Sequence, residues 1–183
     1  MKRNFCILNL TNFILILLLA PLSIASQEEA EGSTMFWSTT LRMIRSKFPE
    51  VNQLSTDTLA SWLNEPDEIK RPLIVDTRDL GEYDVSHLKG ALQASTGDEL
   101  HRILTGLVPG RRVVLYCSVG YRSSEMVRLL LKKGHTQIYN LEGSIFAWAN
   151  EGRPVYQGDK KVDVVHPYDK IWGKLLLKPL RSR

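Results

Sequence analysis

A loop that carries a cysteine and an arginine is the segment of this sequence best suited to covalent chemistry. The loop reads Cys117-Ser-Val-Gly-Tyr-Arg122 and follows an apolar run, Val113–Tyr116, that is typical of a buried strand. A helical pattern, Ser123–Lys133, comes directly after it. This order predicts a thiol at the carboxyl end of a strand, facing the amino terminus of a helix. Unpaired backbone amides and the helix dipole favour an anion there, so we expect a lowered pKa for the Cys117 thiol.

The rest of the loop could bind an anionic substrate beside the thiol. Gly120 permits backbone angles that turn successive amides inward as an anion-binding nest. Arg122 supplies a full charge and a planar fork of donors for an incoming oxyanion. Cys117 is therefore the candidate nucleophile, and the candidate substrate-binding residues are Ser118, Val119, Gly120, Tyr121 and Arg122. The simpler alternative is a buried cysteine before an ordinary helix, with a solvated Arg122.

Apolar runs and helical patterns alternate along the chain and should hold this loop in place. Short apolar runs predict strands at 51–54, 73–75, 113–116 and 138–141. Patterns of helical period predict two helical pieces within 34–64 and helices at 98–107, 123–133 and 144–150. Strands that alternate with helices form a mostly parallel sheet with helices on both faces, an α/β fold. Ligands of such sheets bind beyond the carboxyl ends of the strands, where Cys117 is expected.

Length and composition limit the classes of protein to which the chain could belong. It has 183 residues, of which 43% are apolar and 24% charged, and its net charge is +4. These values fit a globular protein with one domain of ordinary size, and they exclude a disordered or collagen-like chain. The basic excess is too weak to indicate a nucleic-acid partner.

The first 25 residues have the features of an export signal. Two basic residues precede an apolar stretch, and Ser23-Ile-Ala25 places small residues where a signal peptidase cuts. We expect cleavage after Ala25 and an exported protein, periplasmic or extracellular. The alternative is an uncleaved anchor, which is the one way in which we expect the chain to contact a membrane. Cleavage would remove Cys6 and leave Cys117 without a partner for a structural disulfide.

Several motifs taken together resemble the rhodanese-like family over residues 50–156. In chain order they are Leu73-Ile-Val-Asp76-Thr-Arg78, Glu82-Tyr83, His87-Leu-Lys-Gly90-Ala91, the Cys117 loop, Leu141-Glu-Gly143 with Ala147-Trp148, and Gly152-Arg-Pro154-Val155. The resemblance implies a sulfurtransferase with a central parallel five-stranded sheet. It also implies that Cys117 accepts sulfur as a persulfide and that Arg122 is the last residue of the family's six-residue active-site loop.

The resemblance divides the chain into four segments and has some departures. The segments are a signal peptide at 1–25, a partly helical extension at 26–49, a single rhodanese-like domain at 50–156 and a basic tail at 157–183. Ser118 stands where many active relatives carry a second arginine, so anion affinity or substrate choice could differ. Ser86 and Ser144 stand where the family often has glycine, and Tyr121 is bulky for a position inside the loop.

The expected reaction moves one sulfur atom in two steps. The Cys117 thiolate attacks the outer sulfur of thiosulfate or a similar small anion, and a thiophilic acceptor (cyanide, a thiol or a protein) then takes that sulfur. Neither step requires a metal or an organic cofactor. One alternative is a non-enzymatic sulfur carrier or redox-sensing module. Another is a cysteine phosphatase, although phosphatase loops place one more residue between the cysteine and the arginine than this loop does.

Other polar residues are expected to have structural roles. Asp76, Arg78 and Glu82 should brace the edge of the sheet through ion pairs, and His87 should hold a turn. The remaining histidines, His101, His135 and His166, lack the spacing of metal ligands. The leucines at 175–177 could dock the basic tail on the domain.

Overall fold

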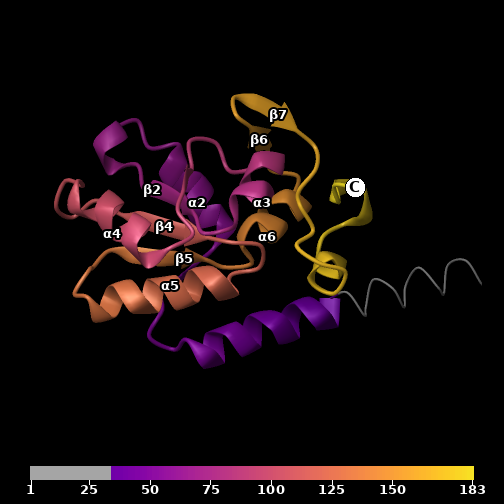
Figure 1. Ribbon diagram of the computed structural model, residues 1–183, viewed down its shortest axis with the longest axis horizontal. Helices are drawn as coiled ribbons and strands as arrows, with labels where there is room; N and C mark the ends of the chain where they lie inside the picture. The colour runs from indigo at the N-terminus through magenta and orange to yellow at the C-terminus, as the bar shows by residue number, and fades with distance from the viewer. Residues whose placement is uncertain (1–33) are drawn as a thin grey trace, which may run out of the picture. The chain divides into compact units, whose positions relative to one another are not determined.

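The computed structural model describes residues 34–183 (Figure 1). The chain divides into two compact units, Met1–Trp37 and Ser38–Arg183, and the second contains the sheet and the Cys117 loop. The predicted export signal at 1–25 lies outside the described residues. Within 34–183, no helix combines the length and the hydropathy of a membrane span.

A parallel sheet of five strands forms the centre of the second unit, which confirms the predicted fold class. The strands are β1 (Gln53–Leu54), β2 (Leu73–Asp76), β3 (Leu92–Gln93), β4 (Val113–Tyr116) and β5 (Ile138–Leu141), in the order β1-β5-β4-β2-β3. All four residues of β4 are buried, because this strand is central and covered on both faces. β2 and β4 pair in register up to Asp76 opposite Tyr116. Cys117 therefore leaves the sheet at the same edge as Asp76.

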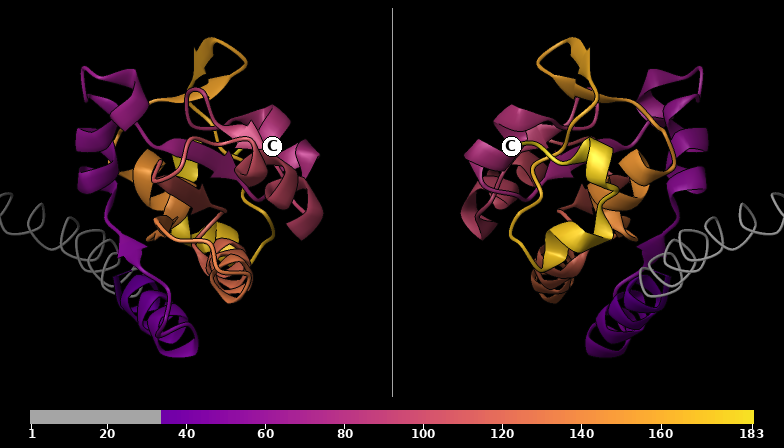
Figure 2. Two further views of the ribbon diagram at one scale, coloured as in Figure 1. Left: turned by 90° about the vertical axis from the view of Figure 1, so that its left-hand side faces the viewer. Right: turned by 90° about the vertical axis from the view of Figure 1, so that its right-hand side faces the viewer.

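Helices cover both faces of the sheet (Figure 2). They are α2 (Thr56–Leu63), α3 (Leu80–Val85), α4 (Gly97–Thr105), α5 (Tyr121–Lys132) and α6 (Ser144–Asn150), preceded by a helix over residues 34–47. Helix α4 packs against α5, and α2 packs against α6. The side chain of Ser55 accepts a hydrogen bond from the Thr58 amide and so caps α2, and Thr96 caps α4 in the same way through the Glu99 amide.

Residue patterns did not predict α3, β3 or a C-terminal hairpin of β6 (Val155–Gln157) and β7 (Lys160–Val162). Strand β3 has only two residues, and Leu92 in it is exposed, so no apolar run in the sequence indicates this strand. The predicted start of the helix at Ser123 was wrong, because α5 begins two residues earlier, at Tyr121. Gly120 precedes the helix in a left-handed conformation with φ 107°, and this brings Arg122 into the first helical turn.

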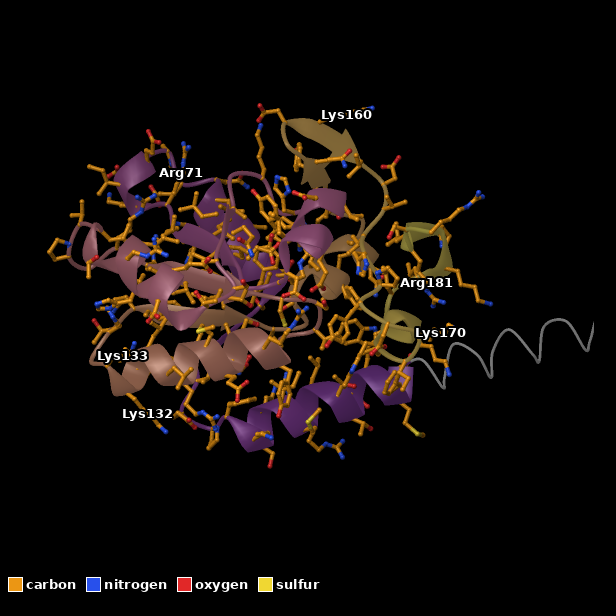
Figure 3. All side chains as sticks on the ribbon, viewed as in Figure 1. Arg71, Lys132, Lys133, Lys160, Lys170 and Arg181 are labelled. Carbon is orange, nitrogen blue, oxygen red and sulfur yellow. The ribbon has the colours of Figure 1, made fainter. Side chains whose placement is uncertain are left out.

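The C-terminal residues pack on the domain. Leu175 and Leu176 are buried, while Leu177 is exposed, so two of the three leucines expected to dock do so. The Asn150 side chain at the end of α6 donates a hydrogen bond to the Leu175 carbonyl (2.8 Å) and accepts one from the Leu177 amide (2.9 Å). Basic side chains such as Lys170 and Arg181 project from this segment, whereas Lys132 and Lys133 lie at the far end of α5 (Figure 3). The basic side chains that are labelled in Figure 3 therefore belong to several separate elements.

A fully buried ion pair braces the sheet beside the predicted site. Arg78 and Asp76 both have side chains that are 0% exposed, and Arg78 Nη2 lies 2.7 Å from Asp76 Oδ2. The same Nη2 donates to the Ser86 carbonyl at 2.5 Å, which ties the end of β2 to the residue after α3. The bracing role expected for Asp76 and Arg78 corresponds to these contacts.

Removing one member of this pair should cost much more stability than removing an exposed pair. Arg78→Met leaves a buried carboxylate without its counter-charge, and we expect the free energy of unfolding to fall by about 3–5 kcal/mol. Lys70→Met, which removes an exposed partner of Asp67, should cost at most about 1 kcal/mol. Urea unfolding at neutral pH measures both, and equal small losses would contradict a bracing role for Arg78.

Candidate active site

The backbone of Cys117 is held from two elements at the carboxyl edge of the sheet. Its amide donates a hydrogen bond to the Ser144 hydroxyl (3.1 Å), and that hydroxyl donates to the Leu141 carbonyl (3.1 Å). The first turn of α6 adds a bond from the Ile145 amide to the Cys117 carbonyl (3.2 Å). Ser144 therefore links the ends of β4 and β5. Residue patterns did not predict this anchoring role of Ser144.

Gly120 places a backbone amide against the sulfur. Its N–H donates a hydrogen bond to Cys117 Sγ at 3.1 Å, which requires the chain to turn sharply between the two residues. A Cβ added at Gly120 would lie 3.1 Å from Asn140 Nδ2 in a left-handed conformation that residues other than glycine rarely adopt. Glycine at this position is therefore required by both space and backbone angles. The amides of Ser118, Val119, Tyr121 and Arg122 donate no hydrogen bond to another loop or strand among the described residues.

The surroundings of Cys117 favour its thiolate. The side chain is 1% exposed, and this burial alone would raise the pKa of the thiol. The positive charge of Arg122, the hydroxyl and amide of Ser123 and the Gly120 amide act in the opposite direction and outweigh burial, so the pKa is lowered. The Ser123 hydroxyl is itself buried, and within the described residues no atom, Cys117 Sγ included, meets the geometry of a hydrogen bond with it.

Arg122 is held by Glu82 of α3. Its two terminal nitrogens lie 2.7 and 2.8 Å from the Glu82 carboxylate oxygens, and Nη2 also donates to the Ser118 hydroxyl at 3.1 Å. Burial alone would raise the pKa of Glu82, but the hydrogen bonds and charge of Arg122 lower it. The terminal donors predicted to receive an oxyanion are thus paired in this state. Glu82 was expected to brace the sheet with Asp76 and Arg78, and its place in the site was not foreseen.

A pocket of about 240 Å³ lies beside the sulfur. Four of the five predicted substrate-binding residues line it together with Cys117, namely Ser118, Val119, Tyr121 and Arg122. The fifth, Gly120, contributes its amide to the sulfur instead. The remaining lining residues, Met43, Tyr168 and Trp172, were not predicted. Tyr168 and Trp172 belong to the C-terminal segment, where turns without helical or strand periodicity hide any packing pattern.

The histidines do not take part in this pocket. His87 stacks on Tyr83 with 4.0 Å between ring centroids, and its backbone exchanges hydrogen bonds with Tyr156. The His101 and His135 rings meet edge to face at 5.9 Å, and His166 accepts a hydrogen bond from the Tyr168 amide. These contacts agree with structural roles.

The contribution of Arg122 to the thiolate can be isolated by substitution within α5. Arg122→Gln removes a positive charge near the sulfur, so the pKa of Cys117 should rise and the alkylation rate at neutral pH should fall. The pH dependence of iodoacetamide alkylation measures this. Arg128→Gln, on the same helix, should leave the profile unchanged. Because Arg122→Gln leaves Glu82 unpaired, Arg122→Gln/Glu82→Gln serves as a second variant, and an unshifted profile in both would contradict the role of the charge.

Comparisons with known proteins agree with this geometry. Residues 55–151 match the rhodanese-like domain family. A sulfurtransferase from Allochromatium vinosum is 31% identical over 108 residues, which are 57% of this chain and 94% of that protein. Other relatives are longer, and the chain matches 24–31% of their length.

Solved structures show the same fold. The rhodanese-like domain of an Anabaena protein has a TM-score of 0.51 and 26% identity over 58% of this chain and 80% of that one. A thiosulfate sulfurtransferase from Pseudomonas aeruginosa has a TM-score of 0.56 over 75% of this chain and 26% of that one, at 16% identity, and shows the fold alone. The match of the family over more than half of the chain, on the sheet and loop described above, means that this protein belongs to the rhodanese-like domain family.

Proposed function

We propose that this protein is a sulfurtransferase that moves a sulfane sulfur from thiosulfate or a similar donor to a thiophilic acceptor through a persulfide on Cys117. The observation that carries the proposal is the buried sulfur of Cys117, which accepts a hydrogen bond from the Gly120 amide and belongs to a residue that lines the pocket. A buried thiol in apolar surroundings would be inert, whereas a thiolate held by amides and a nearby cation is a nucleophile.

In the first half-reaction the thiolate attacks the outer sulfur of the donor. A new bond forms between the two sulfurs, the donor's own S–S bond breaks, and sulfite leaves with the electron pair when the donor is thiosulfate. The loop amides and the positive charge of Arg122, whose terminal nitrogens also contact Glu82, are the groups available to stabilise the charge that develops on the leaving group. Well-placed donors of this kind contribute on the order of 3 kcal/mol each to the transition state.

In the second half-reaction the acceptor attacks the terminal sulfur of the Cys117 persulfide. The anionic persulfide sulfur would extend into the pocket that Arg122 lines, so the positive charge that favours the thiolate also favours the persulfide. Acceptor attack breaks the S–S bond and returns the electron pair to Cys117 as thiolate. Two half-reactions through a covalent intermediate predict ping-pong kinetics.

Intact-mass measurement tests the covalent step. Treatment with thiosulfate should add about 32 Da, one sulfur atom, and cyanide should remove it again. Cys6→Ser should still gain the mass and Cys117→Ser should not, which assigns the sulfur to one of the two cysteines in the chain. If the native protein gains no mass, or if Cys117→Ser gains it equally, the proposal is overturned. A persulfide that forms without turnover to cyanide or small thiols would support the sulfur-carrier alternative instead.

We also propose that the reaction takes place outside the cytoplasm, on the basis of the residue pattern at 1–25. Expression in a bacterium with a secretion pathway should yield a protein that begins at Ser26, as determined by amino-terminal sequencing. A chain that keeps residues 1–25 and remains in the membrane fraction would support the uncleaved anchor instead.

A further inference from the structure

Three residues from outside the family's matched segment line the pocket. The match spans residues 55–151, whereas Met43 comes from the helix over 34–47 and Tyr168 and Trp172 come from the C-terminal segment. We call these three side chains the apolar wall. The family segment therefore supplies the nucleophile, and the two flanking segments supply part of the lining of the same pocket.

The turn that carries Tyr168 and Trp172 is held in place by its own hydrogen bonds. The Asp169 carboxylate accepts bonds from the amides of Ile171 and Trp172, each at 2.8 Å. The Gly173 amide bonds to the Asp169 carbonyl at 3.0 Å, and a Cβ on Gly173 would lie only 2.9 Å from the Pro167 Cβ. Buried Leu175 and Leu176 follow directly. The turn that carries Tyr168 and Trp172 is therefore preorganised, which lowers the entropy lost when a ligand binds to these two members of the apolar wall.

The charge of the pocket is largely compensated within the protein. Arg122 is the one basic side chain among the lining residues in the described part of the chain, and both of its terminal nitrogens contact the Glu82 carboxylate. Its guanidinium also lies over the Tyr168 ring, 4.6 Å from the centroid. A small doubly charged anion would find few free hydrogen-bond donors on Arg122. It would also be too small to fill the space beside the aromatic side chains.

The volume of the pocket also favours a donor larger than thiosulfate. Its 240 Å³ is about eight times the share of one water molecule in the liquid. An aryl or alkyl group could occupy the space along Met43, Tyr168 and Trp172 while the sulfur end of the same molecule reaches Cys117.

We infer that the apolar wall of Met43, Tyr168 and Trp172 binds the organic group of a sulfur donor, so that the preferred donors are organic thiosulfonates or persulfides. This inference rests on the proposed function and narrows its substrate class. With a thiosulfonate, the Cys117 thiolate attacks the terminal sulfur and forms the persulfide. The donor's S–S bond breaks, and its electron pair leaves with the organic sulfinate. Sulfur and charge balance without any added oxidant or reductant.

Three sulfur donors distinguish the effect of the organic group on the rate from the effect of the reacting sulfur. The test compares kcat/KM for benzenethiosulfonate, methanethiosulfonate and thiosulfate with cyanide as acceptor. The first two carry the same charge and the same sulfur centre and differ in the group that would meet the apolar wall. We expect benzenethiosulfonate to exceed methanethiosulfonate by about tenfold or more, because that is the discrimination that apolar contacts give in enzyme pockets.

Substitutions in the apolar wall should reduce this preference. Trp172→Ala and Tyr168→Asn should each lower the ratio of kcat/KM for benzenethiosulfonate to that for methanethiosulfonate. The decrease should be up to about tenfold, which would bring the ratio close to one. Asparagine suits the positive φ of 65° at position 168, so this change removes the ring without adding backbone strain. Ile171→Ala removes an exposed side chain of the same turn that does not line the pocket and should leave the ratio unchanged.

The outcomes distinguish the inference from the function on which it rests. Equal kcat/KM for the two thiosulfonates, or a ratio that survives both substitutions in proteins with native thermal unfolding, would overturn the apolar-wall assignment and leave the sulfurtransferase proposal intact. If none of the three donors forms the Cys117 persulfide, both are overturned. A ratio that falls in the two wall variants and not in Ile171→Ala supports the assignment.

Discussion

The hydrogen bond from the Gly120 amide to Cys117 Sγ is the interaction on which the rest of the site depends. Burying an ionised sulfur costs free energy unless donors and charges compensate it, and Cys117 is 1% exposed. The 3.1 Å bond from Gly120 exists because the chain turns through a left-handed glycine just before α5. The same turn brings Arg122 into the first helical turn, close enough to the sulfur to favour the thiolate. One backbone conformation thus positions both stabilising groups.

The sheet and its neighbouring helices make that conformation rigid. Cys117 follows the last residue of the central strand β4, at the carboxyl edge of the sheet. The first turn of α6 holds the Cys117 backbone through Ser144 and Ile145. On the other side, α3 presents Glu82 to Arg122, and Arg122 joins the loop to the β2–α3 region. A reactive loop at the end of a parallel sheet gains precision from such contacts, since loops alone are more mobile than the elements they connect.

Residue patterns predicted the parts of this arrangement that depend on local sequence. Strands β4 and β5 and helix α6 were located because continuous apolar runs and glycine stops mark them, and four of the five expected substrate-binding residues do line the pocket beside Cys117. The pairing of Arg122 with Glu82 was missed because the two residues are 40 positions apart and meet only through the fold. The apolar wall was missed because Tyr168 and Trp172 lie among turns, where a side chain's destination depends on tertiary packing.

The pH at which Cys117 ionises in the folded protein shows whether its surroundings stabilise the thiolate. In Cys6→Ser, the ultraviolet absorbance of the thiolate is followed against pH, with Cys6→Ser/Cys117→Ser subtracted to remove the tyrosine signal. We expect a midpoint below that of the same chain unfolded in urea, because Arg122, Ser123 and the Gly120 amide outweigh the effect of burial. A midpoint equal to or above the unfolded value would show that burial prevails, and would contradict the thiolate nucleophile.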